Sequence, residues 1–256
     1  MMKKLVKLFA LAAVMLLCGQ SMAQTRGVMS LGASFPMKDY ADFDGFNEFA
    51  LLTYDEDDGG AGLGFNAGLK WYFNLGVKGL GVMLSVDGLY NGPCADLKDA
   101  YRNSEIEMSN SLVSGSFSYS STPKYINVPA MLGLNYIYRF NPNFGLFVEA
   151  GAGGNLRFIT EMVTVAKNEA LGFESKTTVI NQYDKVFSFA YQAGIGIEVA
   201  KNLVIGCSFY DLGNGTVNMT EIKKFNAGGN TTETKDYKEL GTVHPIMVLG
   251  RIGFRF

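Results

Sequence analysis

The sequence predicts an all-β fold, namely an eight-stranded antiparallel transmembrane β-barrel with short turns at one end and four long loops at the other. First, apolar residues recur at every second position in eight separate segments, which is the period of a strand. Second, the connections between these segments alternate between short and long. Third, the chain stops on GFRF, inside an apolar and aromatic segment, although soluble domains usually let their termini fray into water.

Residues 1–23 have the form of a cleaved export signal, with lysines followed by an apolar run and then small residues. The run at 8–18 is too short to cross a bilayer, which takes about 20 apolar residues. We therefore expect residues 24–256 to form a single outer-membrane β-barrel domain. A lipoprotein cut at Cys18 is the lesser alternative, because Leu17 stands where a small residue is preferred.

Composition excludes several functional classes. Loss of residues 1–23 removes three lysines and no acids, which leaves 19 basic against 24 acidic residues. An acidic protein is poorly suited to nucleic acid, whose binding depends on basic contacts to phosphate. Cys94 and Cys207 fall in different settings, a long loop and an outward strand position, so we expect neither a disulfide nor a cysteine metal site.

The first four strands are predicted at 26–35, 61–74, 80–91 and 125–138. The clearest is AGLGFNAGLKWYFN at 61–74, where apolar residues hold one parity and glycine, Asn and Lys70 hold the other. A helix would place Leu63, Phe65 and Leu69 on different sides, so the pattern indicates a strand.

The last four strands are predicted at 146–155, 187–199, 203–210 and 246–256. Their inward parity is again glycine or polar, and it includes Glu149, Glu198 and Arg251. A soluble β-sandwich or a lipocalin-like barrel is the alternative, but its interior would need bulky apolar residues on this second face.

The connections support a membrane barrel. Loops longer than about 12–15 residues are uncommon in compact soluble domains, whereas outer-membrane barrels carry short periplasmic turns and long outer loops. The short connections lie near 74–78, 139–143 and 200–202, and the long ones at roughly 36–60, 92–122, 157–185 and 213–242. Lipid offers no hydrogen-bond partners, so the sheet must close on itself, and we expect localisation in the bacterial outer membrane.

Three segments carry a resemblance to a known family: KYINVPAMLGLNY, GLFVEAGAGGN and the terminal GFRF. With them the chain resembles the small porin-like, PorT-type outer-membrane β-barrels, and its general build is similar to the eight-stranded OmpA and OmpX type. The resemblance implies a bulge at Pro129, and it implies that Phe254 and Phe256 form a terminal signal for the outer-membrane assembly machinery. It also suggests an accessory role in secretion. Phe256 and Phe254 are further expected to join Tyr136, Tyr138, Trp71 and Phe73 in an aromatic girdle.

Four charged residues share the inward parity: Lys70, Glu149, Glu198 and Arg251. The interior of an eight-stranded barrel is just wide enough for side chains to fill it, and buried charges there must be paired or hydrated. We predict an interior charge network that plugs the barrel. The alternative is that these charges form a gate rather than a structural filling.

Few residues suggest catalysis or metal binding. His244 is the single histidine, and we expect it at the outer rim without a catalytic role, because no motif marks a nucleophile beside it. The acidic first loop, with carboxylates from Asp39 to Asp58, is expected to be solvated; cation bridging to lipopolysaccharide is a weaker hypothesis. We therefore predict no enzyme, no cofactor and no metal residue.

The outer loops are the remaining candidates for function. Strand-like stretches at 116–121, 161–165 and 176–181 are expected to prolong the barrel and to bind an extended partner by strand addition, through residues 161–181. We predict a structural or adhesive role through these loops, toward a protein or surface ligand. A small diffusion pore is the first alternative, followed by a lipid-modifying enzyme. The expected partners include the lipid bilayer, lipopolysaccharide and the assembly machinery.

Overall fold

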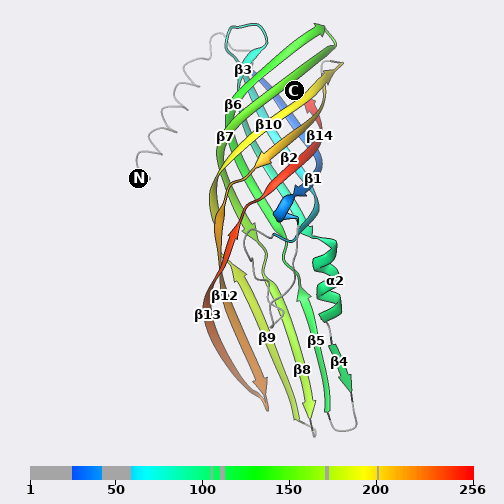
Figure 1. Cartoon of the computed structure of the whole chain (residues 1–256), viewed down its shortest axis with the longest axis vertical. Coiled ribbons are helices and arrows are strands. Elements are labelled where there is room, and N and C mark those ends of the chain that lie inside the picture. The colour runs from blue at the N-terminus through cyan, green and yellow to red at the C-terminus, as the bar shows by residue number, and fades with distance from the viewer. Residues whose placement is uncertain (1–24, 42–58, 105, 110–112, 171–172, 201) are drawn as a thin grey trace, which may run out of the picture.

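The computed structural model describes residues 25–41, 59–104, 106–109, 113–170, 173–200 and 202–256 (Figure 1). The expected signal peptide at 1–23 and the acidic stretch at 42–58 lie outside the described residues.

Across the described residues, eight strands form a closed barrel in the order β1-β14-β11-β10-β7-β6-β3-β2. They are β1 (Thr25–Met37), β2 (Ala61–Asn74), β3 (Leu80–Pro93), β6 (Tyr125–Asn141), β7 (Phe144–Ile159), β10 (Val186–Val199), β11 (Leu203–Asp211) and β14 (Ile246–Arg255). All neighbours pair antiparallel, including β1 with β14 at the seam. The predicted fold class is confirmed.

A second sheet, here called the outer sheet, lies beyond the long-loop end of the barrel (Figure 1). Its strands, in the order β13-β12-β9-β8-β5-β4, are β4 (Ile106–Ser109), β5 (Val113–Ser121), β8 (Met162–Ala170), β9 (Phe173–Tyr183), β12 (Gly215–Ala227) and β13 (Asn230–Val243). The strand-like stretches expected in the second and third loops are confirmed as parts of β5, β8 and β9. The strands β12 and β13 were not predicted, because NTTETKDYKELGTV is polar along most of its length.

The outer sheet continues the barrel wall. Five barrel strands lead into it across breaks of two or three residues, as β11 does at 212–214 and β14 at 244–245. Because β8 and β9 lie in the centre of the outer sheet, residues 161–181 do not form its free edge as expected. In the described part of the chain, its edges are β4 and β13.

Two short helical segments accompany the strands: η1 (Lys38–Tyr40) after β1, and α2 (Ala95–Ser104) after β3, which runs beside β5 (Figure 1). Among the described residues, no helix has the length and apolar character needed to cross a membrane.

The barrel wall is apolar on its outer surface. Leu63 is 73% exposed and Phe189 70% exposed, and many other outward aliphatic and aromatic side chains of the barrel wall are exposed as well. These include Met29, Leu31, Phe65, Leu132, Leu134, Val148, Phe187, Tyr191, Ile195, Ile205, Phe209 and Ile252. Of the expected girdle, Tyr136, Tyr138, Phe254 and Phe256 are exposed, whereas Trp71 and Phe73 are half-buried.

Pro129 does not produce the expected bulge. Its pairing with Asn155 on β7 is in register. On the β3 side the ladder is interrupted between Asn127 and Ala130, but the same register resumes beyond the interruption. Proline lacks an N–H, so it removes one ladder donor without forcing an extra residue into the strand.

Candidate functional site

The lumen contains a buried ion pair between Arg251 of β14 and Asp87 of β3, with 2.8 Å between Nη1 and Oδ1. The Tyr210 hydroxyl donates to the other Asp87 oxygen at 2.6 Å and accepts from Arg251 Nη2 at 3.3 Å. The strands β3 and β11 lie on opposite sides of the barrel, so these contacts tie the wall together across the lumen.

A second buried pair joins Lys70 of β2 to Glu149 of β7. The Tyr72 hydroxyl donates to the remaining Glu149 oxygen at 3.0 Å. Both carboxylate oxygens are therefore satisfied, as a charge needs to be when it is removed from water.

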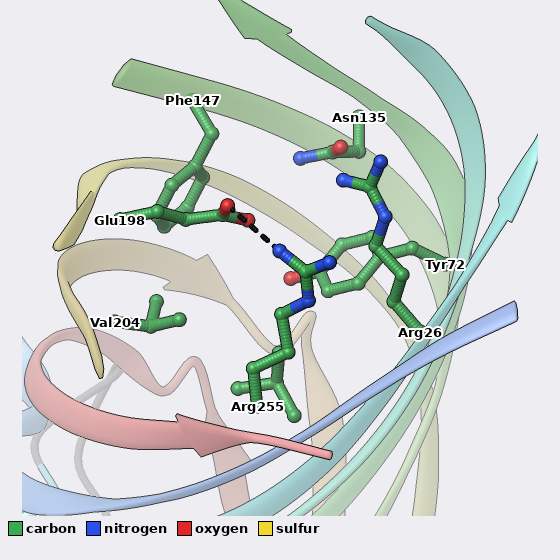
Figure 2. Close-up of a pocket in the computed structure, with 8 residues that line it drawn as sticks. Arg26, Tyr72, Asn135, Phe147, Glu198, Val204 and Arg255 are labelled. Carbon is green, nitrogen blue, oxygen red and sulfur yellow. Dashed lines mark hydrogen bonds and ion pairs between the residues drawn. The ribbon is translucent and has the colours of Figure 1, made fainter. Parts of the chain in front are cut away.

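The third group lies near the ends of β10, β6 and β14, at the short-turn end of the lumen, and part of it is drawn in Figure 2. Glu198 of β10 pairs with Arg139 of β6 and with Arg255 of β14, the latter at 3.2 Å. Arg26 of β1 extends into the same mouth, where Figure 2 shows its guanidinium beside Asn135. The hollow between these side chains measures about 10 Å³, enough for about one water molecule.

The rest of the lumen is filled by apolar side chains that share the inward parity of their strands. Methionine and leucine, at Met83, Leu89, Met131, Met247 and Leu249, are at most 1% exposed. Unbranched methionine fills irregular gaps well.

Glycine makes room for two of the lumen carboxylates. A Cβ at Gly68 would lie 1.8 Å from Asp87 Oδ1, and one at Gly194 would lie 2.9 Å from Glu149 Cγ. At these two positions of the glycine-rich inward face, the absence of a side chain leaves the space that the carboxylates occupy.

Arg157 closes the other end of the lumen. It is 1% exposed, and its guanidinium donates to the carbonyls of Val243 at 3.0 Å and Gly213 at 3.2 Å. Gly213 lies within the break between β11 and β12, and Val243 is the last residue before the break between β13 and β14. Nearby, the buried Tyr40 of η1 accepts from Asn127 at 3.3 Å.

The structure places all four predicted interior residues inside the barrel and gives each an ion-pair partner, in three separate groups. Sequence reasoning missed the partners Asp87, Arg139 and Arg255. Each has the inward parity of its strand, so extending the parity count to every charged residue would have found them.

His244 lies at the rim, where its Nε2 is 2.7 Å from Asp211 Oδ1. Cys94 and Cys207 are free, as expected. The acidic residues expected at 42–58 lie outside the described residues. Among the described side chains, no group of three or more His, Cys, Asp or Glu could hold a metal ion.

Charge is also balanced within the outer sheet. Glu221 of β12 is 2% exposed and accepts from Lys223 at 2.9 Å and Lys238 at 3.2 Å. Burial by itself would raise the pKa of Glu221, but the two lysines outweigh it and hold the pKa below its ordinary value of 4.5.

The closed barrel, its apolar outer surface and its paired interior define the class of protein: a transmembrane β-barrel of the outer-membrane type. An open sheet edge cannot stand in lipid, and the pairing of β1 with β14 removes it. By the layout of this class, the short-turn end is periplasmic and the outer sheet is extracellular.

Solved structures that are similar to the chain include two outer-membrane proteins. One is Ail, the attachment invasion locus protein of Yersinia pestis, in complex with the heparin analogue sucrose octasulfate. It is 20% identical with a TM-score of 0.34, covering 91% of this chain and 99% of Ail. The other is the outer membrane protein OprG from Pseudomonas aeruginosa, 14% identical with a TM-score of 0.40, covering 93% of this chain and 98% of OprG. No protein-family model and no curated protein matches the sequence.

Proposed function

We propose that the protein is a non-conducting outer-membrane barrel that binds an extracellular protein or surface ligand through its outer sheet. The observation that carries the proposal is the combination of a lumen crossed by ion pairs with a wall that continues beyond the membrane as a sheet. A lumen filled in this way leaves little space for solute, so the extracellular surface is where a specific contact has room to form.

The free edge of β13 is the proposed contact. Among the described residues this strand, Asn230–Val243, pairs with β12 alone, so the backbone groups on its other side are available to an extended partner segment. Charged residues on this edge, such as Lys235, Asp236 and Glu239, disfavour unspecific strand pairing. They therefore favour a partner whose charges are complementary to them.

The test is to shorten the β12–β13 hairpin. Met219 and Lys238 are paired, so an Asn-Gly turn can replace residues 220–237 and leave the barrel strands intact. Adherence of bacteria that display the shortened protein to immobilised surface proteins and polysaccharides should fall to the level of cells lacking it. Undiminished adherence, with equal amounts of folded barrel, would refute the proposal.

We also propose that the chain is exported by the signal at 1–23 and assembled through its terminal aromatics. In support, Phe256 still pairs with Gly27, with hydrogen bonds of 2.9 and 3.1 Å, and its ring is exposed. Deleting Phe256 should lower the amount of assembled barrel in outer membranes while leaving synthesis unchanged. Equal assembly would contradict the role of this residue.

Kinship with the PorT-type family is part of the same proposal. It rests on the three segments that carry the resemblance, which fall in β6, β7 and β14. A non-enzymatic role is part of the same proposal, because among the described residues the His244 ring is hydrogen-bonded to Asp211 and to no hydroxyl or thiol that could act as a nucleophile.

A further inference from the structure

The periplasmic mouth of the lumen carries more positive than negative charge. Arg26, Arg139 and Arg255 converge there on Glu198. Glu198 already pairs with Arg139 and Arg255, whereas Arg26 forms no ion pair or side-chain hydrogen bond with the described part of the chain. Three arginines against the single carboxylate of Glu198 leave this group of described side chains with a surplus of positive charge.

The unpaired charge borders empty space. The hollow of about 10 Å³ beside Arg255 adjoins a second of about 30 Å³, and both are lined by Arg26, Tyr72 and Asn135. Together they have room for a few water molecules, which a bound anion could displace. In Figure 2 the Arg26 and Arg255 guanidinium groups enter this space from different strands, with Tyr72 close to both.

We propose that this mouth, here called the arginine mouth, is a binding site for a phosphate group presented from the periplasmic side. Arginine forms bidentate, charge-assisted hydrogen bonds to phosphate oxygens. A phosphate group carries up to two negative charges and offers several oxygens to more than one arginine, whereas a carboxylate carries one charge and two oxygens. The group could belong to a lipid head or to a free phosphate.

The experiment titrates the full-length protein, purified from outer membranes in a non-ionic detergent, with inorganic phosphate and with a short-chain phosphatidic acid by calorimetry. Binding of the lipid alone identifies a headgroup as the source, and binding of inorganic phosphate identifies a free anion; either supports the site. Acetate should bind more weakly than phosphate. Absence of binding by both phosphate probes, or acetate binding as tightly as they do, would overturn the proposal.

Two variants test the residues. Arg26→Gln should weaken phosphate binding at least about tenfold, the effect of losing charged hydrogen bonds. Asn135→Asp keeps every arginine but sets a carboxylate beside Arg26, and it should weaken binding in the same way. Arg102→Gln is the matched control, because Arg102 is exposed on α2 at the extracellular end. Unchanged affinity in both mouth variants, or an equal loss in the control, would refute the site.

Discussion

Asp87 and Arg251 face each other across the lumen at 2.8 Å, three strands apart around the barrel and 164 residues apart in the chain. The aspartate side chain is fully buried and the arginine 5% exposed. The two charges come together only when β1 pairs with β14 and closes the barrel, so this ion pair stabilises the closed barrel.

Asp87→Asn should destabilise the barrel by about 3–5 kcal/mol, because it leaves the buried Arg251 without its counter-charge. The measurement is urea unfolding in detergent, followed by the fluorescence of the single tryptophan, Trp71. The double variant Asp87→Asn/Arg251→Met should recover part of the loss. Asp96→Asn, at an exposed position on α2, should change little. A single variant as stable as the wild type would contradict this reading of the lumen.

Gly68→Ala should also destabilise the barrel, since the new methyl group would lie 1.8 Å from Asp87 Oδ1 and push the carboxylate away from Arg251. Gly92→Ala, in the same barrel wall, serves as control, because no described atom lies within 4 Å of a Cβ placed at Gly92. The same unfolding assay should separate the two variants. Equal free energies of unfolding for the two variants would show that the close contact between Gly68 and Asp87 does not contribute to stability.

The orientation of the barrel can be tested with epitope tags. A tag between Gly228 and Gly229, in the β12–β13 turn, should be labelled by antibody on intact cells. A tag at Gly76, in the β2–β3 turn, should be labelled only after the outer membrane is permeabilised. All three glycines have positive φ and open space around them, so neither insertion disturbs packing. The opposite labelling pattern would invert the assigned topology.

The outer sheet should loosen in acid. Because the pKa of Glu221 is lowered in the folded state, its stabilising contribution is present above its ordinary pKa of 4.5 and is lost as the pH falls through the lowered value. Hydrogen-exchange protection factors of β12 and β13 should therefore drop at low pH, and Glu221→Gln should remove much of this dependence. Glu239→Gln, at an exposed position, should retain it. Equal pH dependence in both variants would contradict the role of Glu221.

Much of this architecture could be predicted from the sequence, because apolar and polar residues must alternate along a strand that has one face in lipid and the other in the lumen. Lys70, Glu149, Glu198 and Arg251 could be placed inside by parity alone. Their partners could not be assigned, because which side chains meet across a lumen depends on the order and stagger of strands around it. Leu89 and Leu249 share the inward parity too, but their contribution to filling the lumen shows only in the packed barrel.

The strands of the outer sheet could be predicted only in part. Because they are surrounded by water, they do not need an apolar face along their whole length. Residues 230–240 are accordingly polar, and they become a strand through pairing with β12, which in turn continues β11. The alternation that identifies membrane strands is weak here, because tertiary pairing decides the conformation.

Planar-bilayer conductance of the mature chain, residues 24–256, is the decisive test of a filled barrel whose function lies at its extracellular sheet. Folding of the same sample is checked separately by its mobility on unheated gels. We expect a silent membrane, because ion pairs and buried methionines occupy the lumen. Stable, stepwise channels would contradict it and would favour a diffusion pore instead.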